Sequence, residues 1–176
     1  MLEDVFVEDS VARHPLAGQR AVAYVFIGLA IVALLFSFFY PPLMTIGWLV
    51  AIAFFVVFYF YNRSIDIDFD YSVTNGVFDV AKIISKENRK DLRTVDLKEE
   101  LVLVAPQGNP ALHSYAEKRL KTLNACGNDN DRDTYCLIAK DAKDSATEYA
   151  ILFQPNREVL QAMHRVKPRE VILTND

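Results

Sequence analysis

The longest uncharged stretch of the chain runs from Ala21 to Asn62 and is interrupted near its middle by Pro41-Pro42. Each half holds about 20 mostly apolar residues, enough to cross the hydrocarbon core of a bilayer as a helix. The proline pair cannot continue a helix, so the chain reverses there. The pattern predicts a hairpin of two transmembrane helices within residues 21–62.

The basic residues that flank this hairpin predict its orientation. Arg13 and Arg20 precede the first span, Arg63 follows the second, and residues 40–45 between the spans carry no charge. Positive charge stays on the cytoplasmic side, so we expect a two-span cell-membrane protein with both termini in the cytoplasm. A cleaved signal peptide fits less well, because the first residues are acidic and the apolar run is too long. Residues 1–20 then form a cytoplasmic segment, and residues 63–176 form a cytoplasmic domain.

After the hairpin, apolar and polar residues alternate with period two, which predicts a half-buried strand over residues 65–73. Asn75-Gly76 follows, and both of these residue types tolerate the positive φ of a type I′ turn. A two-residue turn places Phe69 opposite Lys82 and pairs apolar residues almost throughout. Further strands are expected around residues 92–97 and 101–105.

A helical period replaces the alternation after Gly108. Asn109 is a suitable cap, Pro110 suits a first turn, and apolar residues at 112, 115, 120 and 123 share one face. We therefore expect a helix over residues 110–125.

The last third of the chain predicts two strands, residues 134–140 and 148–153, and a helix over residues 157–166 capped by Asn156. Residues 171–173 have the composition of a short terminal strand. Mostly antiparallel strands with a C-terminal amphipathic helix indicate an α+β fold, a small β-barrel or sandwich domain.

One set of motifs lies between residues 74 and 97: Thr74-Asn75-Gly76, Asp79, Lys82-Ile83-Ile84, Lys86, Arg89-Lys90, Leu92 and Asp96-Leu97. These motifs resemble those of small bacterial membrane proteins that carry a pleckstrin-homology-like (PH-like) domain. A second set lies nearer the two ends: Phe6-Val7-Glu8, Val11, Arg13, Phe153-x-Pro155 and Pro168-Arg169. This set is similar to that of one uncharacterised family of that kind, in which two spans precede the domain. The resemblance implies a fold but no chemistry.

Composition and motif spacing argue against most enzyme classes. No glycines are spaced for a dinucleotide or phosphate loop or a nucleophile elbow, and His14, His113 and His164 lie far apart. Cys126 and Cys136 are expected to be free thiols on the reducing side of the membrane. Net charge is −4, too acidic for nucleic-acid binding. No catalytic residue, cofactor or metal site is predicted.

Two acidic patterns have both a functional and a simpler interpretation. Asp129, Asp131 and Asp133 open like a calcium loop, but the required glycine and bidentate glutamate are missing, which favours a solvated turn. Aspartates 66, 68 and 70 line one strand face and could recruit a cation or a basic partner. Polar-out alternation favours a stripe that faces water.

The candidate binding residues are basic and surround one turn of the predicted sheet: Lys82, Lys86, Arg89, Lys90 and Arg93. Lys82 falls on the apolar face, where its stem can snorkel. The cluster is positioned for an anionic leaflet, although Glu87 and Asp91 dilute it and a solvated turn is the simpler alternative.

Three function classes remain open. The first is a non-enzymatic, membrane-tethered binding or scaffold module that docks membrane lipids or a protein partner. The second is an accessory subunit of a larger membrane complex, or a homo-oligomer, in which the small residues Gly47 and Ala51 allow close helix packing. The third is an enzyme without recognisable motifs.

Overall fold

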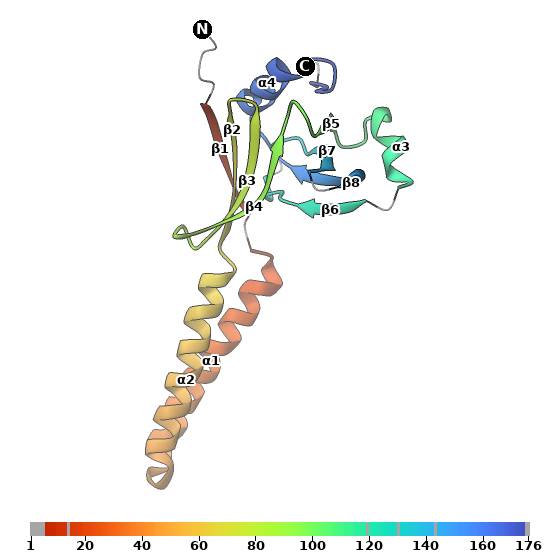
Figure 1. Cartoon of the computed structure of the whole chain (residues 1–176). Coiled ribbons are helices and arrows are strands. Elements are labelled where there is room, and N and C mark those ends of the chain that lie inside the picture. Colours follow the sequence, from red (N-terminus) through yellow and green to blue (C-terminus); the bar gives the residue numbers. More distant parts are fainter. Residues whose placement is uncertain (1–5, 14, 119, 130, 143, 175–176) are drawn as a thin grey trace. The chain divides into compact units, whose positions relative to one another are not determined.

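The computed structural model describes residues 6–13, 15–118, 120–129, 131–142 and 144–174 (Figure 1). His14 lies outside the described residues. The chain divides into a helical unit, residues 14–67 and 84–87, and a sheet unit that contains residues 1–13, 68–83 and 88–176.

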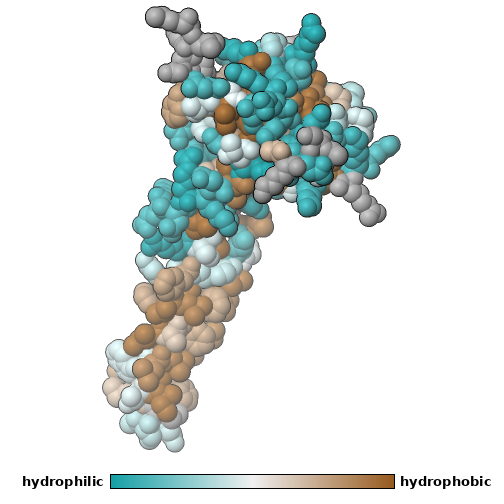
Figure 2. All heavy atoms as spheres, viewed as in Figure 1, coloured by the Kyte–Doolittle hydropathy of each residue, from teal (hydrophilic) through white to brown (hydrophobic). Residues whose placement is uncertain are grey.

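The helical unit contains the two predicted helices, α1 (Ala17–Phe39) and α2 (Met44–Ser64), joined by a short 3₁₀ turn at Pro41–Leu43. Both are long and apolar enough to cross a membrane. Figure 2 shows apolar side chains over much of their length. Each helix extends beyond the uncharged run, so Arg20 lies in the first turn of α1 and Arg63 in the last turn of α2.

Small residues form the contact between the two helices. Ala23, Ala30 and Ser37 are buried at seven-residue intervals on α1, and Ala51 is buried on α2. A Cβ added to Gly47 would overlap the Ser37 hydroxyl, so glycine is needed for this close approach. The Gly47 and Ala51 motif therefore packs inside the hairpin, and the surface predicted for a larger membrane complex is used within the chain.

The first sheet of the sheet unit has the strand order β1-β2-β3-β4. Its strands are β1 (Phe6–Arg13), β2 (Ile67–Thr74), β3 (Val77–Ile84) and β4 (Asn88–Asp96). The turn between β2 and β3 has φ of 53° at Asn75 and 91° at Gly76, which confirms the predicted type I′ geometry. β4 begins four residues earlier than predicted.

β1 is an element that the sequence did not predict. It precedes the helical hairpin but pairs with β2, the strand that follows the hairpin. Its Asp9 carboxylate accepts hydrogen bonds from Arg132 Nη1 at 2.7 Å and from the Asn156 amide at 2.8 Å. The sequence predicts residues 1–20 as a segment separate from the domain. In the structure, part of this segment supplies a strand of the domain.

The second sheet has the order β5-β7-β8-β6. Its strands are β5 (Leu101–Pro106), β7 (Tyr135–Asp141), β8 (Asp144–Phe153) and β6 (Lys121–Asn124). β6 pairs in parallel with β8, from Lys121 opposite Tyr149 to Asn124 opposite Leu152.

The helix predicted over residues 110–125 is wrong beyond its first turns. A 3₁₀ turn at Pro110–Leu112 leads into α3, which is only His113–Ala116, and the remainder turns into β6. Asn109 does cap the start, because its Oδ1 accepts from the Ala111 amide at 3.0 Å. Pairing with the free edge of β8 satisfies the backbone of residues 121–124 and overrides their helical pattern.

Aromatic side chains from both sheets meet in the core. Tyr71 and Phe78 of the first sheet lie with ring centroids 5.7 and 5.2 Å from Phe153 of the second. The helix α4 (Arg157–Val166) has the predicted bounds, and Asn156 Oδ1 accepts from the Val159 amide at 2.9 Å. In place of a terminal strand, Val171 forms one parallel bridge to Val104. The described strands form two sheets rather than a closed barrel, and the helix α4 follows them near the C-terminus.

Candidate functional site

The five predicted basic residues occupy two strands and the turn between them. Lys82 lies half-buried in β3, and Lys86 is exposed in the β3–β4 turn, residues 84–87. Arg89, Lys90 and Arg93 lie in β4. They differ sharply in whether their charges are already paired within the chain.

Arg89 forms an ion-pair cluster with acidic residues of the sheet unit. Its Nη1 lies 2.6 Å from Asp70 Oδ2 and 3.8 Å from Glu8 Oε1, and its Nε lies 3.5 Å from Asp91. Since β3 lies between β2 and β4 in the sheet, the Arg89 side chain crosses β3 to reach Asp70. Arg89 therefore holds the sheet together, and its charge is largely compensated.

Asp70 corrects the prediction of a water-facing acidic stripe. Asp66 is exposed and Asp68 is half-buried, but the Asp70 side chain is only 3% exposed. Burial raises the pKa of the Asp70 carboxyl above its usual value, and the nearby Arg89 guanidinium opposes that rise. The acidic residues of β2 are therefore only partly open to water, Asp68 more than Asp70.

Arg93 is engaged by the second sheet. Its Nη2 lies 2.8 Å from Asp141 Oδ2, and its guanidinium carbon lies 4.3 Å from the centre of the Tyr149 ring. A guanidinium over an aromatic face is attracted by the ring quadrupole. Arg93 accordingly joins β4 to β7 and β8, leaving little of its charge for a ligand.

Three cations of the candidate set are exposed, and of these Arg89 is paired. The other two, Lys86 and Lys90, form no ion pair with any residue that the structure describes. The structure therefore separates the five predicted residues into two arginines that pair within the domain, the half-buried Lys82, and two exposed lysines, Lys86 and Lys90, without an ion pair to a described residue.

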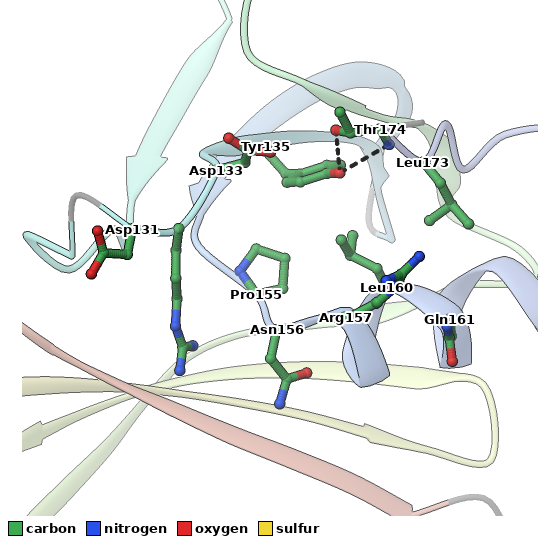
Figure 3. A pocket seen from close by; sticks show the side chains of 11 residues that line it. Asp131, Asp133, Tyr135, Pro155, Asn156, Arg157, Leu160, Gln161, Leu173 and Thr174 are labelled. Atoms are coloured by element: carbon green, nitrogen blue, oxygen red, sulfur yellow. Dashed lines mark hydrogen bonds between the residues drawn. The ribbon is translucent and has the colours of Figure 1, made fainter. Parts of the chain in front are cut away.

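One hollow of the sheet unit lies between the β6–β7 connection, α4 and the C-terminal segment (Figure 3). Its volume is about 840 Å³. The Tyr135 hydroxyl lies 2.8 Å from Thr174 Oγ1 at one side of it. Arg132 is held by Asp9 and also lies 3.2 Å from Asp129. The described lining has no histidine, cysteine or lysine, and its two hydroxyl groups, on Tyr135 and Thr174, are hydrogen-bonded to each other.

A second hollow brings together one cysteine and one histidine. His113 and Cys136 both line a cavity of about 450 Å³ between α3 and the second sheet. No hydrogen bond joins the two side chains in the described part of the chain, and Cys136 is a free thiol. Burial raises the pKa of the Cys136 thiol, the opposite of the shift that activates a catalytic cysteine. This pair lacks the features of a nucleophilic site.

Metal-binding residues do not converge in the described part of the chain, where no three His, Cys, Asp or Glu side chains are placed to hold an ion. In the acidic segment that resembles a calcium loop, Asp129 Oδ1 instead accepts from the Asp131 amide at 3.1 Å. The Asp129 carboxylate is therefore engaged by its own loop.

One of the three comparisons with known proteins finds a match, and that match is consistent with the two-sheet fold and its C-terminal helix. No curated protein and no solved structure matches the chain. A family described as "Bacterial PH-like domain (DUF6106)" matches residues 3–173, a range that includes β1, both long helices and α4. This chain belongs to the bacterial PH-like domain family DUF6106.

Proposed function

We propose that this protein is a non-enzymatic, membrane-tethered binding module whose β3–β4 turn meets an anionic lipid surface at the cytoplasmic face. The single observation that carries the proposal is the conformation of Lys86. Together with Ser85, it sits at the tip of the turn with φ of 58°.

This turn uses unfavourable residues for its geometry. The Glu87 amide donates to the Ile84 carbonyl at 3.3 Å, and both central residues have positive φ, as in a type I′ turn. Asn-Gly is the favoured pair there, and the β2–β3 turn uses it. Lysine in the left-handed region costs about 1–2 kcal/mol relative to glycine. A strained cation at an exposed tip supports a role outside folding.

The turn belongs to the same unit as the apolar helices. The Ser85 amide donates to the Asp66 carbonyl at 2.9 Å, and the Glu87 carboxylate pairs with Arg63 in the last turn of α2. If α2 crosses a membrane, Lys86 lies close to the headgroups, and Lys90 follows within about 13 Å of strand. Each contributes about 1 kcal/mol near an anionic surface, screened by salt over about 8 Å.

The pairing of β1 with β2 supports the orientation. One strand leads into the hairpin and the other leads out of it, so both ends of the hairpin emerge on the same side of the membrane. With Arg13, Arg20 and Arg63 flanking the helices, that side is the cytoplasm. Reporter proteins fused at each terminus should both be active in the cytoplasm, and a terminus that is active only outside contradicts this orientation.

The lipid contact is tested by amine-reactive footprinting of the full chain in lipid nanodiscs. Lys86 and Lys90 should react several-fold more slowly in phosphatidylglycerol than in phosphatidylcholine nanodiscs, and high salt should remove the difference. Lys140, an exposed lysine of β7, is the internal control and should react equally in both. Equal reactivity of Lys86 in both lipids at low salt overturns the proposal and favours a protein partner.

The variant Lys86→Gly separates membrane contact from folding. Glycine adopts a positive φ without strain, so the free energy of unfolding of the domain should rise by about 1 kcal/mol. The protection of Lys90 by anionic lipid should weaken in the same variant, because half of the charge of the two exposed lysines is lost. A loss of both stability and protection would show that Lys86 acts in folding.

A further inference from the structure

A cavity of about 530 Å³ lies in the helical unit, where α1 begins and α2 ends. Its volume falls within the range of small-molecule sites. The side chains that line it include Arg20 and Tyr24 of α1, Tyr59 and Arg63 of α2, and the following Asp66 and Glu87. All of these residues belong to one unit of the chain.

Two of the four charges in this cavity already pair with each other. Arg63 contacts the Glu87 carboxylate and donates to the Tyr59 hydroxyl at 3.2 Å. This network fixes the last turn of α2 against the β3–β4 turn. It leaves Arg63 unable to offer its full charge to a ligand.

The other two charges are opposite in sign and uncompensated. The side chains of Arg20 and Asp66 are exposed, and neither forms an ion pair or a side-chain hydrogen bond with the residues that the structure describes. Tyr24 and Tyr59, 68% and 50% exposed, flank them with aromatic rings. Such rings prefer the boundary between headgroups and acyl chains.

We propose that this cavity binds the headgroup of a phospholipid that carries both a phosphate and a primary ammonium, as phosphatidylethanolamine does. Arg20 donates to the phosphate, for which the guanidinium fork is well suited. The Asp66 carboxylate accepts from the ammonium, and an acyl chain follows Tyr24 and Phe58 into the membrane. Pockets with basic residues between transmembrane helices bind headgroups in this way.

The charges of the cavity select against the other common headgroups. Phosphatidylglycerol would bring the same phosphate to Arg20, but its glycerol group carries no positive charge to compensate Asp66. Phosphatidylcholine carries a positive charge but no N–H group to donate to Asp66. The cavity therefore prefers the zwitterion with the primary amine.

Native mass spectrometry of the full chain in detergent tests this preference with phosphatidylethanolamine, phosphatidylcholine and phosphatidylglycerol of identical acyl chains. Phosphatidylethanolamine should bind about tenfold more tightly than either, the factor expected for one ionic hydrogen bond. Arg20→Gln should weaken its binding by a similar factor. Asp66→Asn should equalise the three lipids. Lys140→Gln, a change in β7 outside the cavity lining and outside the β3–β4 turn, should leave the preference unchanged.

Equal binding of the three lipids by the unaltered chain overturns the proposal, and so does a preference for phosphatidylglycerol. The inference rests on the membrane placement proposed above, which is tested separately by extracting cell membranes with alkaline carbonate. A chain that remains in the membrane fraction but shows no headgroup preference contradicts only the cavity assignment. A chain released by carbonate contradicts the membrane placement itself.

Discussion

Removing one hydroxyl group, in Tyr71→Phe, should reveal how strongly the two sheets depend on a single buried contact. Tyr71 in β2 is fully buried, and its hydroxyl donates to the Ala125 carbonyl and accepts from the Gln154 amide at 3.3 Å. Burial raises the pKa of this phenol well above its ordinary value, so it remains a donor at every accessible pH. Phenylalanine keeps the ring but removes both hydrogen bonds.

The expected cost follows from the two groups left behind. A buried donor or acceptor without a partner costs about 1–3 kcal/mol. Two such groups are left behind, and since the hydrogen bond from Gln154 is long at 3.3 Å, we expect the free energy of unfolding to fall by about 2 kcal/mol, the lower end of their summed cost. With a urea m-value of about 2 kcal/mol/M for a domain of this size, the unfolding midpoint should fall by about 1 M.

Pulse proteolysis of the full chain in detergent and increasing urea measures this midpoint for the part outside the micelle. Tyr115→Phe is the matched control, because the Tyr115 hydroxyl has no hydrogen bond to a described residue and Tyr115 is only half-buried. It should shift the midpoint little. If both variants lower the unfolding midpoint by the same small amount, the hydroxyl of Tyr71 does not join the sheets and the reasoning is wrong.

Three further variants can be measured in the same assay. Gly76→Val places a β-branched residue at φ of 91° and should cost about 1–3 kcal/mol; an unchanged midpoint would contradict the assigned turn. Asp9→Ala leaves the Asn156 amide without its acceptor, whereas Arg132 keeps Asp129 at 3.2 Å; the change should cost about 1–3 kcal/mol, and a cost below 1 kcal/mol would show that β1 is held by other contacts. The raised pKa of Asp70 makes the folded state bind a proton more readily than the unfolded state. The contribution of Asp70 to the free energy of unfolding therefore falls as the pH rises above 3.8, the ordinary pKa of an aspartate. Asp70→Asn should therefore reduce that fall, and an unchanged pH profile would contradict the assignment.

The features that the sequence predicted correctly depend on residues close together in the chain. The proline pair and the uncharged runs are sufficient for two apolar helices. Asn75-Gly76 defines its turn because both residues accept positive φ. Asn156 caps α4 three residues before its amide partner, Val159. Each of these signals has its physical cause within a few residues.

The errors occur where a distant partner decides the local structure. Residues 121–124 have an acceptable helical pattern, but the edge of β8 offers them backbone hydrogen bonds. The segment 6–13 carries no strong signal of its own and becomes a strand only because β2 lies beside it. Strand pairing over such separations leaves little trace in single-sequence periodicity.

In the candidate site, too, the sequence predicted the local features, and the tertiary structure decided those that depend on distant residues. Sequence identified the basic residues of the β3–β4 region and their place after an apolar hairpin, because charge and hydropathy belong to the residues themselves. Only the tertiary structure showed that Arg89 and Arg93 are paired with Asp70 and Asp141, while Lys86 is exposed in a strained turn. Whether a charge is available to a partner depends on its neighbours in space. Those neighbours come from strands that are far apart in the sequence.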